Sequence, residues 1–180
     1  IYQKKSDYNS FVRGEPTRVT AETKPLETPD VVNDPVVNRH TAVLTGLEPG
    51  TTYVYSVGDG SDDGWSELAE FTTAPDRVEP FSFIYMGDAQ NGLERWGSLV
   101  KHAFRSRPDA AFYVMAGDLV NRGEQRDDWD RLFENAQGVY DRRQLVPALG
   151  NHEYHGGEPV LYLEQFTLPT NGPESIAPEK

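Results

Sequence analysis

The pattern of hydrophobic and polar positions changes near residue 76. Residues 1–76 are rich in Thr, Val, Pro and Gly and contain no stretch with helical periodicity. Within 40–60, two hydrophobic segments flank a Pro49-Gly50 turn, which predicts strand, turn, strand, and 65–75 predicts a further strand. The pattern is carried by Ala42, Leu44 and Leu47 before the turn and by the alternating Tyr53, Tyr55 and Val57 after it. Short strands separated by turns predict an all-β sandwich.

Residues 77–180 follow a different pattern. The apolar runs 80–86, 110–116 and 144–149 have the composition of buried strands, and hydrophobic residues between them recur at helical spacing. Strand, helix, strand, helix, strand predicts an α/β unit with parallel strands. The helical positions are Trp96, Leu99, Val100, Ala103 and Phe104, and then Trp129, Leu132, Phe133 and Ala136 with Val139 and Tyr140 one turn further.

Four acidic side chains accompany the second predicted helix: Glu124, Asp127, Asp128 and Asp130. We expect them to form a solvated face opposite the hydrophobic residues, where their charge complements the positive end of the helix dipole. On this interpretation the four acidic residues do not form a ligand-binding site.

Each of the three apolar strands is followed by glycine and polar side chains: Gly87-Asp88, Gly117-Asp118 and Gly150-Asn151-His152-Glu153. The carboxyl ends of parallel strands meet at one edge of the sheet, where α/β folds bind ligands. One Gly-Asp pair alone would indicate an ordinary turn, but three after successive strands favour a functional site. Oxygen and imidazole ligands suit cations such as manganese, iron, zinc or magnesium. The sequence therefore predicts a metal site at this edge.

Charge and composition exclude several other classes of protein. With 17 Lys and Arg against 29 Asp and Glu, the formal net charge is −12, so we expect no nucleic-acid binding surface. No segment approaches the roughly 18 apolar residues of a membrane span, and the first residues do not have the pattern of a signal peptide. The absence of cysteine excludes disulfides, zinc–thiolate sites and cysteine nucleophiles.

Three motifs carry a resemblance to a known family. GDAQ (87–90), GDLVNRG (117–123) and GNHE (150–153) resemble the first three motifs of the calcineurin-like metallophosphoesterases. LEPGTTY (47–53) resembles the late strands of a fibronectin type III domain, where the leucine and the tyrosine form a buried corner; an ordinary hairpin is the alternative. Together with LPTNGPE (168–174), the chain resembles the bacterial purple acid phosphatase branch of the superfamily.

The resemblance implies a fibronectin type III-like β-sandwich over 1–76, followed over 77–180 by the first half of an α/β metallophosphoesterase sandwich. A sandwich of this kind uses about 90–100 residues, so we expect the front domain to lack its first strands. The family's later motifs, which supply further histidine ligands, would fall beyond Lys180. We therefore expect residues 1–180 alone to be inactive, to bind metal weakly and to leave the outer face of the apolar strands exposed.

The resemblance also implies an activity and a role for each motif residue. The complete protein would be a phosphatase that uses two metal ions (iron, manganese or zinc) and attacks phosphate esters with a metal-bound hydroxide. Asp88 would bind the first metal, Asp118 would bridge both, and Asn151 would bind the second. His152 would contact the substrate phosphate and act as general acid or leaving-group stabiliser, and Glu153 would orient its neighbours. The alternative is a non-catalytic fibronectin-like adhesion or binding module with a degenerate phosphoesterase domain.

Three positions depart from the pattern of purple acid phosphatases or extend it. Gln90 stands where the superfamily often has a histidine, and its side-chain oxygen is a candidate metal ligand. Asn121 stands where purple acid phosphatases have the tyrosine that gives iron(III) its colour, so we do not expect a purple enzyme. Asn121-Arg122-Gly123 resembles the phosphoprotein phosphatases instead, which makes Arg122 a candidate phosphate clamp; the alternative is a surface residue at a helix start.

Partners and location follow from the same resemblance. The expected partner is a small phosphate ester, whose identity and monoester or diester class stay open. His155 is a candidate substrate contact or a solvated loop residue, and His40 and His102 have no expected catalytic role. The resemblance favours a secreted, periplasmic or cell-surface protein, while a cytoplasmic one stays open.

Overall fold

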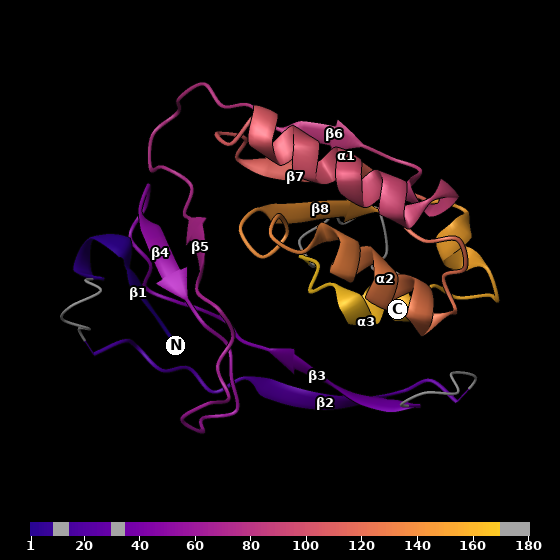
Figure 1. Cartoon of the computed structure of the whole chain (residues 1–180), viewed down its shortest axis with the longest axis horizontal. Helices are drawn as coiled ribbons and strands as arrows, with labels where there is room; N and C mark the ends of the chain where they lie inside the picture. The colour runs from indigo at the N-terminus through magenta and orange to yellow at the C-terminus, as the bar shows by residue number, and fades with distance from the viewer. Residues whose placement is uncertain (9–14, 30–34, 170–180) are drawn as a thin grey trace, which may run out of the picture.

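The computed structural model describes residues 1–8, 15–29 and 35–169, which form a β unit followed by an α/β unit (Figure 1). The front unit contains β1 (Tyr2–Lys4), η1 (Lys5–Asp7), β2 (Glu22–Glu27), β3 (Val36–Thr41), β4 (Thr52–Tyr55) and β5 (Ala69–Thr72). The second unit contains β6 (Ile84–Met86), η2 (Ala89–Asn91), α1 (Leu93–Ser106), β7 (Phe112–Ala116), α2 (Arg126–Ala136), β8 (Gln144–Ala148), η3 (His152–Tyr154) and α3 (Val160–Gln165). The predicted order of β and then α/β elements is confirmed.

The strands of the front unit pair differently from our prediction. β4 lies between β1 and β5 in an antiparallel sheet, whereas β2 and β3 form a separate hairpin. The predicted strand–turn–strand within 40–60 is therefore wrong, because the chain between β3 and β4 turns at both Gly46 and Gly50, with φ of +68° and +57°. Val57 lies beyond β4 and is exposed.

Tyr53 anchors the turn that precedes β4. Its side chain is 4% exposed, and its hydroxyl accepts the Glu48 N–H at 2.9 Å. Its ring stacks on Phe71 of β5, with the ring centres 5.6 Å apart. A buried tyrosine hydroxyl bonded to upstream backbone makes a corner of the kind seen in β-sandwiches.

The second unit is built on the parallel sheet that the sequence predicts. β7 lies in the centre with β6 and β8 parallel on either side. Because the three strands run in one direction, the segments that begin at Gly87, Gly117 and Gly150 leave the sheet at the same edge. The topology therefore brings the three motifs together.

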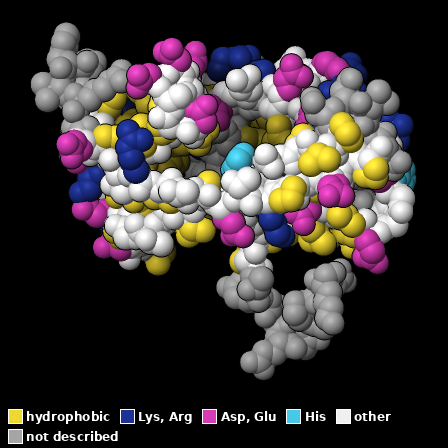
Figure 2. Space-filling view, turned by 90° about the horizontal axis from the view of Figure 1, so that it is seen from below, with side chains coloured by type: hydrophobic (Ala, Val, Ile, Leu, Met, Phe, Trp, Pro, Cys, Tyr) yellow, Lys and Arg dark blue, Asp and Glu magenta, His cyan; other side chains and the backbone are white. Residues whose placement is uncertain are grey.

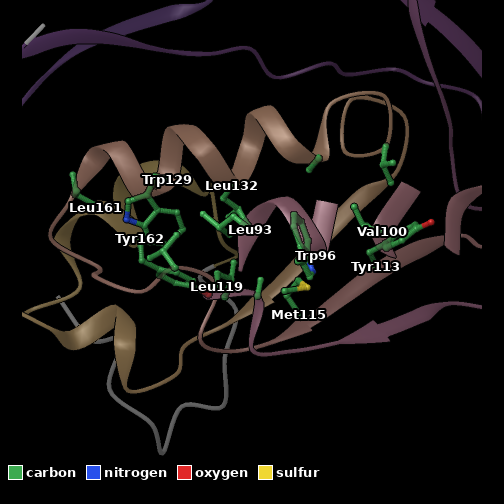
Figure 3. Close-up of a cluster of buried hydrophobic side chains, with 14 residues drawn as sticks. Leu93, Trp96, Val100, Tyr113, Met115, Leu119, Trp129, Leu132, Leu161 and Tyr162 are labelled. Carbon is green, nitrogen blue, oxygen red and sulfur yellow. The ribbon is translucent and has the colours of Figure 1, made fainter. Parts of the chain in front are cut away.

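α1 and α2 cover one face of this sheet, and the core lies between (Figure 1). Tyr113 and Met115 of β7 are fully buried against the helices, as Figure 3 shows. The other buried side chains of the core labelled there are Leu93, Trp96, Val100, Leu119, Trp129, Leu132, Leu161 and Tyr162.

Two details of the predicted helices are wrong. Leu99 is 56% exposed, whereas Gly97 is buried. A Cβ at Gly97 would lie 2.8 Å from the Asn135 Cβ, so α1 and α2 approach closely at this glycine. The buried stripe of α1 therefore includes Gly97 and not Leu99. Val139 and Tyr140 do not extend α2, because the chain turns at Gly138, where φ is +86°.

The opposite face of the sheet is exposed and apolar. Phe83, Tyr85 and Val146 are 48%, 69% and 40% exposed, and Phe83 stacks on Phe112 at 5.3 Å. Parallel sheets are normally covered on both faces. The exposed outer face expected from the sequence is thus present in the structure.

The two units touch at several points. The Tyr55 hydroxyl donates to the Asp141 carbonyl at 2.6 Å, and Arg39 of β3 pairs with Glu164 of α3 at 3.2 Å. A cavity of about 810 Å³ lies between the units, with Tyr55 and Trp65 among its lining. On the face seen in Figure 2, hydrophobic side chains line a recess over the front unit, on the left.

No helix in the described segments is long and apolar enough to span a membrane.

Burial predicts opposite outcomes for two leucines of this fold. Leu132→Ala removes a side chain that is 1% exposed and should lower the free energy of unfolding by about 2–5 kcal/mol. Leu99→Ala should change it by less than about 0.5 kcal/mol. Urea denaturation of both variants measures the difference, and an equal loss would contradict the placement of Leu99.

Candidate active site

A single buried carboxylate joins the second and third motifs. Glu153 is 1% exposed, and its side chain accepts the backbone N–H of Asp118 at 3.0 Å, of Leu119 at 2.8 Å and of Gly150 at 2.7 Å. These charge-assisted bonds compensate the cost of burying the carboxylate. Burial, with the charge of Glu153 adding to it, raises the pKa of the neighbouring Tyr162 to about 12. The expected orienting role of Glu153 stays a prediction, but its contacts suit that role.

The two motif aspartates have unusual backbone conformations. Asp88 and Asp118 adopt positive φ angles of 55° and 52°, a region in which Asp and Asn are enriched among residues other than glycine. The Asp88 N–H donates to the Gly117 carbonyl at 3.2 Å, which ties the first motif to the second. A Cβ at Gly150 would lie 2.1 Å from Asp118 Oδ1, so glycine is required where the third motif passes this carboxylate.

Gln90 lies beside Asp118, where the sequence predicts a metal ligand. Its backbone N–H donates to the Asp118 carbonyl at 3.2 Å, and its side-chain amide is 3.5 Å from Asp118 Oδ2. Its Oε1 atom is buried and has no hydrogen-bond partner among the described residues. An unsatisfied buried oxygen is costly, and a cation beside Asp118 would satisfy it.

The oxygen donors at this edge therefore fit a hard cation. The candidate ligands are Asp88, Gln90, Asp118 and Asn151, and Asn151 is exposed at the start of η3. Within residues 1–8, 15–29 and 35–169 no group of three or more His, Asp or Glu side chains is placed to hold a metal, so the set of candidate ligands includes the amide side chains of Gln90 and Asn151.

His152 lies between the second and third motifs. Its backbone N–H donates to Asp118 Oδ1 at 3.1 Å, and its ring Nδ1 is 2.7 Å from the Asn121 carbonyl. Since a carbonyl oxygen only accepts, Nδ1 carries a proton and Nε2 is the free ring nitrogen. The His155 ring lies 4.7 Å from the His152 ring, which places it near the site. His40 and His102 are exposed and lie elsewhere, on β3 and α1.

Arg122 follows Asn121 in the second motif and is held by Asp128 of α2. Its side chain is 53% exposed; its N–H donates to Asp128 Oδ2 at 3.1 Å, and its Nε lies 3.8 Å from the same oxygen. The prediction of a solvated Asp128 is wrong, because this residue is 6% exposed. Asp128 stands four residues before Leu132 and eight before Ala136, on the buried stripe of α2. This spacing is the feature of the sequence that could have indicated its burial.

Comparisons with known proteins show the family of this chain. The family model of the calcineurin-like phosphoesterases matches residues 81–176, which is more than half of the chain. The chain belongs to this family. The model of the purple acid phosphatase N-terminal domain matches residues 2–73 of the chain. Our boundary at residue 76 lies between the two matched ranges and stays a prediction.

Individual relatives are similar over most of the chain. A probable purple acid phosphatase 20 of Arabidopsis thaliana is 29% identical over 126 residues, which cover 69% of this chain and 27% of the relative. Uncharacterized proteins of two Mycobacterium tuberculosis strains are 30% identical over 176 residues, with 86% of this chain and 32% of each relative covered. The structure of the purple acid phosphatase PPD1 from yellow lupin seeds matches with a TM-score of 0.73 and 19% sequence identity. The match covers 95% of this chain and 35% of the lupin chain, and it shows a shared fold.

The chain spans about a third of the length of these relatives. The motif LPTNGPE (168–174) lies largely outside the described residues. The roles of the site residues, the two-metal centre and the location of the protein stay predictions.

The contacts of Glu153 generate a stability prediction. Glu153→Gln replaces one acceptor oxygen by an NH₂ donor that faces backbone N–H groups. The free energy of unfolding should therefore fall by about 1–3 kcal/mol. Chemical denaturation measures this loss, with exposed Glu158→Gln as the matched control. Equal stabilities of the two variants would show that the carboxylate does not hold the motifs together.

Proposed function

We propose that the complete protein is a phosphoesterase that uses two metal ions to hydrolyse small phosphate esters. One observation supports this proposal: three motif loops leave the same edge of the parallel sheet and are hydrogen-bonded to one another. The Asp88 N–H donates to the Gly117 carbonyl, the His152 N–H donates to Asp118 Oδ1, and the Glu153 carboxylate accepts the N–H groups of Asp118 and Gly150. The family to which the chain belongs supports the reaction class. Activity measured on a panel of phosphate monoesters and diesters identifies the substrate class.

Asp88, Gln90, Asp118 and Asn151 are the residues of this chain that would hold the ions. Bound ions would supply Lewis-acid chemistry, which lowers the pKa of water and neutralises charge on phosphoryl oxygens. The oxygen-rich donor set suits iron, manganese or zinc without the colour of a tyrosine–iron(III) centre, because Asn121 replaces that tyrosine.

His152 and Arg122 would act on the substrate. The Asn121 carbonyl fixes the His152 ring through Nδ1, so Nε2 is free to hydrogen-bond the phosphoryl group or, when protonated, to give its proton to the leaving oxygen. The exposed guanidinium of Arg122 would grip phosphate oxygens in a forked arrangement, while Asp128 limits its freedom.

Asp118→Asn in the complete protein tests the proposal. The Asn side chain tolerates the same backbone conformation, but it loses the charge that would bridge two ions. We expect the kcat/KM for p-nitrophenyl phosphate to fall by several orders of magnitude and the metal content, measured by elemental analysis, to fall with it.

Asp127→Asn is the matched control, because Asp127 is exposed on α2. This variant should retain full activity. A loss of less than tenfold in Asp118→Asn would remove Asp118 from the bridging role, and a complete protein that binds no divalent metal would refute the proposed function.

His152→Ala separates substrate contact from metal binding. The variant should lose turnover, by about 10²–10⁴-fold if the imidazole acts as general acid, and retain its metal content. Kinetics and elemental analysis of the same preparation provide both readings. Loss of the metal ions from this variant would instead make His152 a ligand.

A further inference from the structure

The first turn of α2 holds the loop that carries Arg122. Asp128 accepts the Arg122 N–H at 3.1 Å, and the Trp129 indole donates to the Gly123 carbonyl at 3.0 Å. Asp128 is 6% exposed and Trp129 is fully buried; the contact of Asp128 is partly buried and that of Trp129 is fully buried. The position of α2 therefore sets the position of the loop at 121–123.

The same loop holds His152. The Gly123 N–H donates to the His152 carbonyl at 3.0 Å, and the Asn121 carbonyl lies 2.7 Å from His152 Nδ1. A Cβ at Gly123 would lie 2.2 Å from the Glu153 carbonyl oxygen, so the loop and the third motif are in direct backbone contact. A shift of α2 would move both side chains proposed to contact phosphate.

The front unit contacts α2 at its first residue. Arg126 is 5% exposed, and its Nη1 donates to the Thr28 hydroxyl at 3.2 Å, across 98 residues of sequence. Thr28 is itself buried and is held by Pro35, whose carbonyl accepts the Thr28 N–H at 2.7 Å and its hydroxyl at 3.2 Å. The hydroxyl proton is thus used within the front unit, and the oxygen lone pair is directed to Arg126.

We propose that Thr28 is a positioning residue of the phosphate site, acting through Arg126 and α2 on Asp128 and the loop that carries Arg122. The front unit is then part of the catalytic architecture rather than a separate binding module. This proposal rests on the proposed function for its effect on kinetics, but the mechanical coupling is independent of any activity.

Thr28→Val in the complete protein removes the acceptor and preserves the shape of the side chain. Amide hydrogen exchange followed by mass spectrometry should be faster over 121–125 and unchanged over β7. Thr28→Ser, which keeps the hydroxyl, should restore the original rates. Thr23→Val is the matched control, because Thr23 is an exposed residue of β2, the strand that ends just before Thr28, and its hydroxyl contacts His40.

Kinetics test the route through Arg122. Thr28→Val should raise KM about fivefold, the equivalent of one hydrogen bond, and should lower kcat as well because His152 moves with the loop. In an Arg122→Ala background the same substitution should raise KM hardly further, because the guanidinium that it positions is gone. A merely structural loss would add to both backgrounds equally.

Unchanged exchange over 121–125, or a KM increase of equal size in both backgrounds, overturns the proposal. If the complete protein hydrolyses no phosphate ester, the proposed function fails, and the exchange rates over 121–125 alone decide whether Thr28 holds the loop.

Discussion

The site depends on how one buried charge is compensated. Glu153 has no salt-bridge partner among the described residues; backbone N–H groups of the second and third motifs surround it instead. Since a buried carboxylate is costly unless its oxygens are bonded, the loops after β7 and β8 can fold only in the arrangement that directs their N–H groups inward. The side chains of Asp118 and Asn151 follow from that backbone geometry. Structural stability and ligand placement are thus coupled in the same residues.

The position of the candidate site at the edge of the parallel sheet could be predicted from the sequence. The pairing of the strands of the front unit could not. Apolar runs followed by Gly-Asp or Gly-Asn predict strands and their ends, and parallel connectivity then fixes where the ends meet. The hairpin of β2 and β3 also has contacts with the second unit, such as the pair Arg39–Glu164, which no local pattern contains. Periodicity within 40–60 therefore identified β4 but assigned the wrong neighbour to it.

Asp128 shows a different limit of sequence reasoning. An acidic residue near a helix N-terminus is usually solvated, and its neighbours Asp127 and Asp130 are exposed as expected. The burial of Asp128 follows from the backbone N–H of Arg122, a donor that exists only once the loop has folded. Side-chain type and spacing identify a candidate ligand, but the residues that hold it depend on backbone groups that every sequence has.

The left-handed backbone at Asp88 and Asp118 restricts what evolution can do with these positions. Apart from glycine, Asn and Asp are the residues that occupy this region at least cost, and a β-branched residue would add strain of about 1–3 kcal/mol to the loss of the ligand. Relatives that have abandoned hydrolysis should therefore retain Asn or Gly here rather than drift freely. A pseudoenzyme of this family would still have a recognisable motif, and its loss of activity would show in the missing charge and not in the shape of the loop.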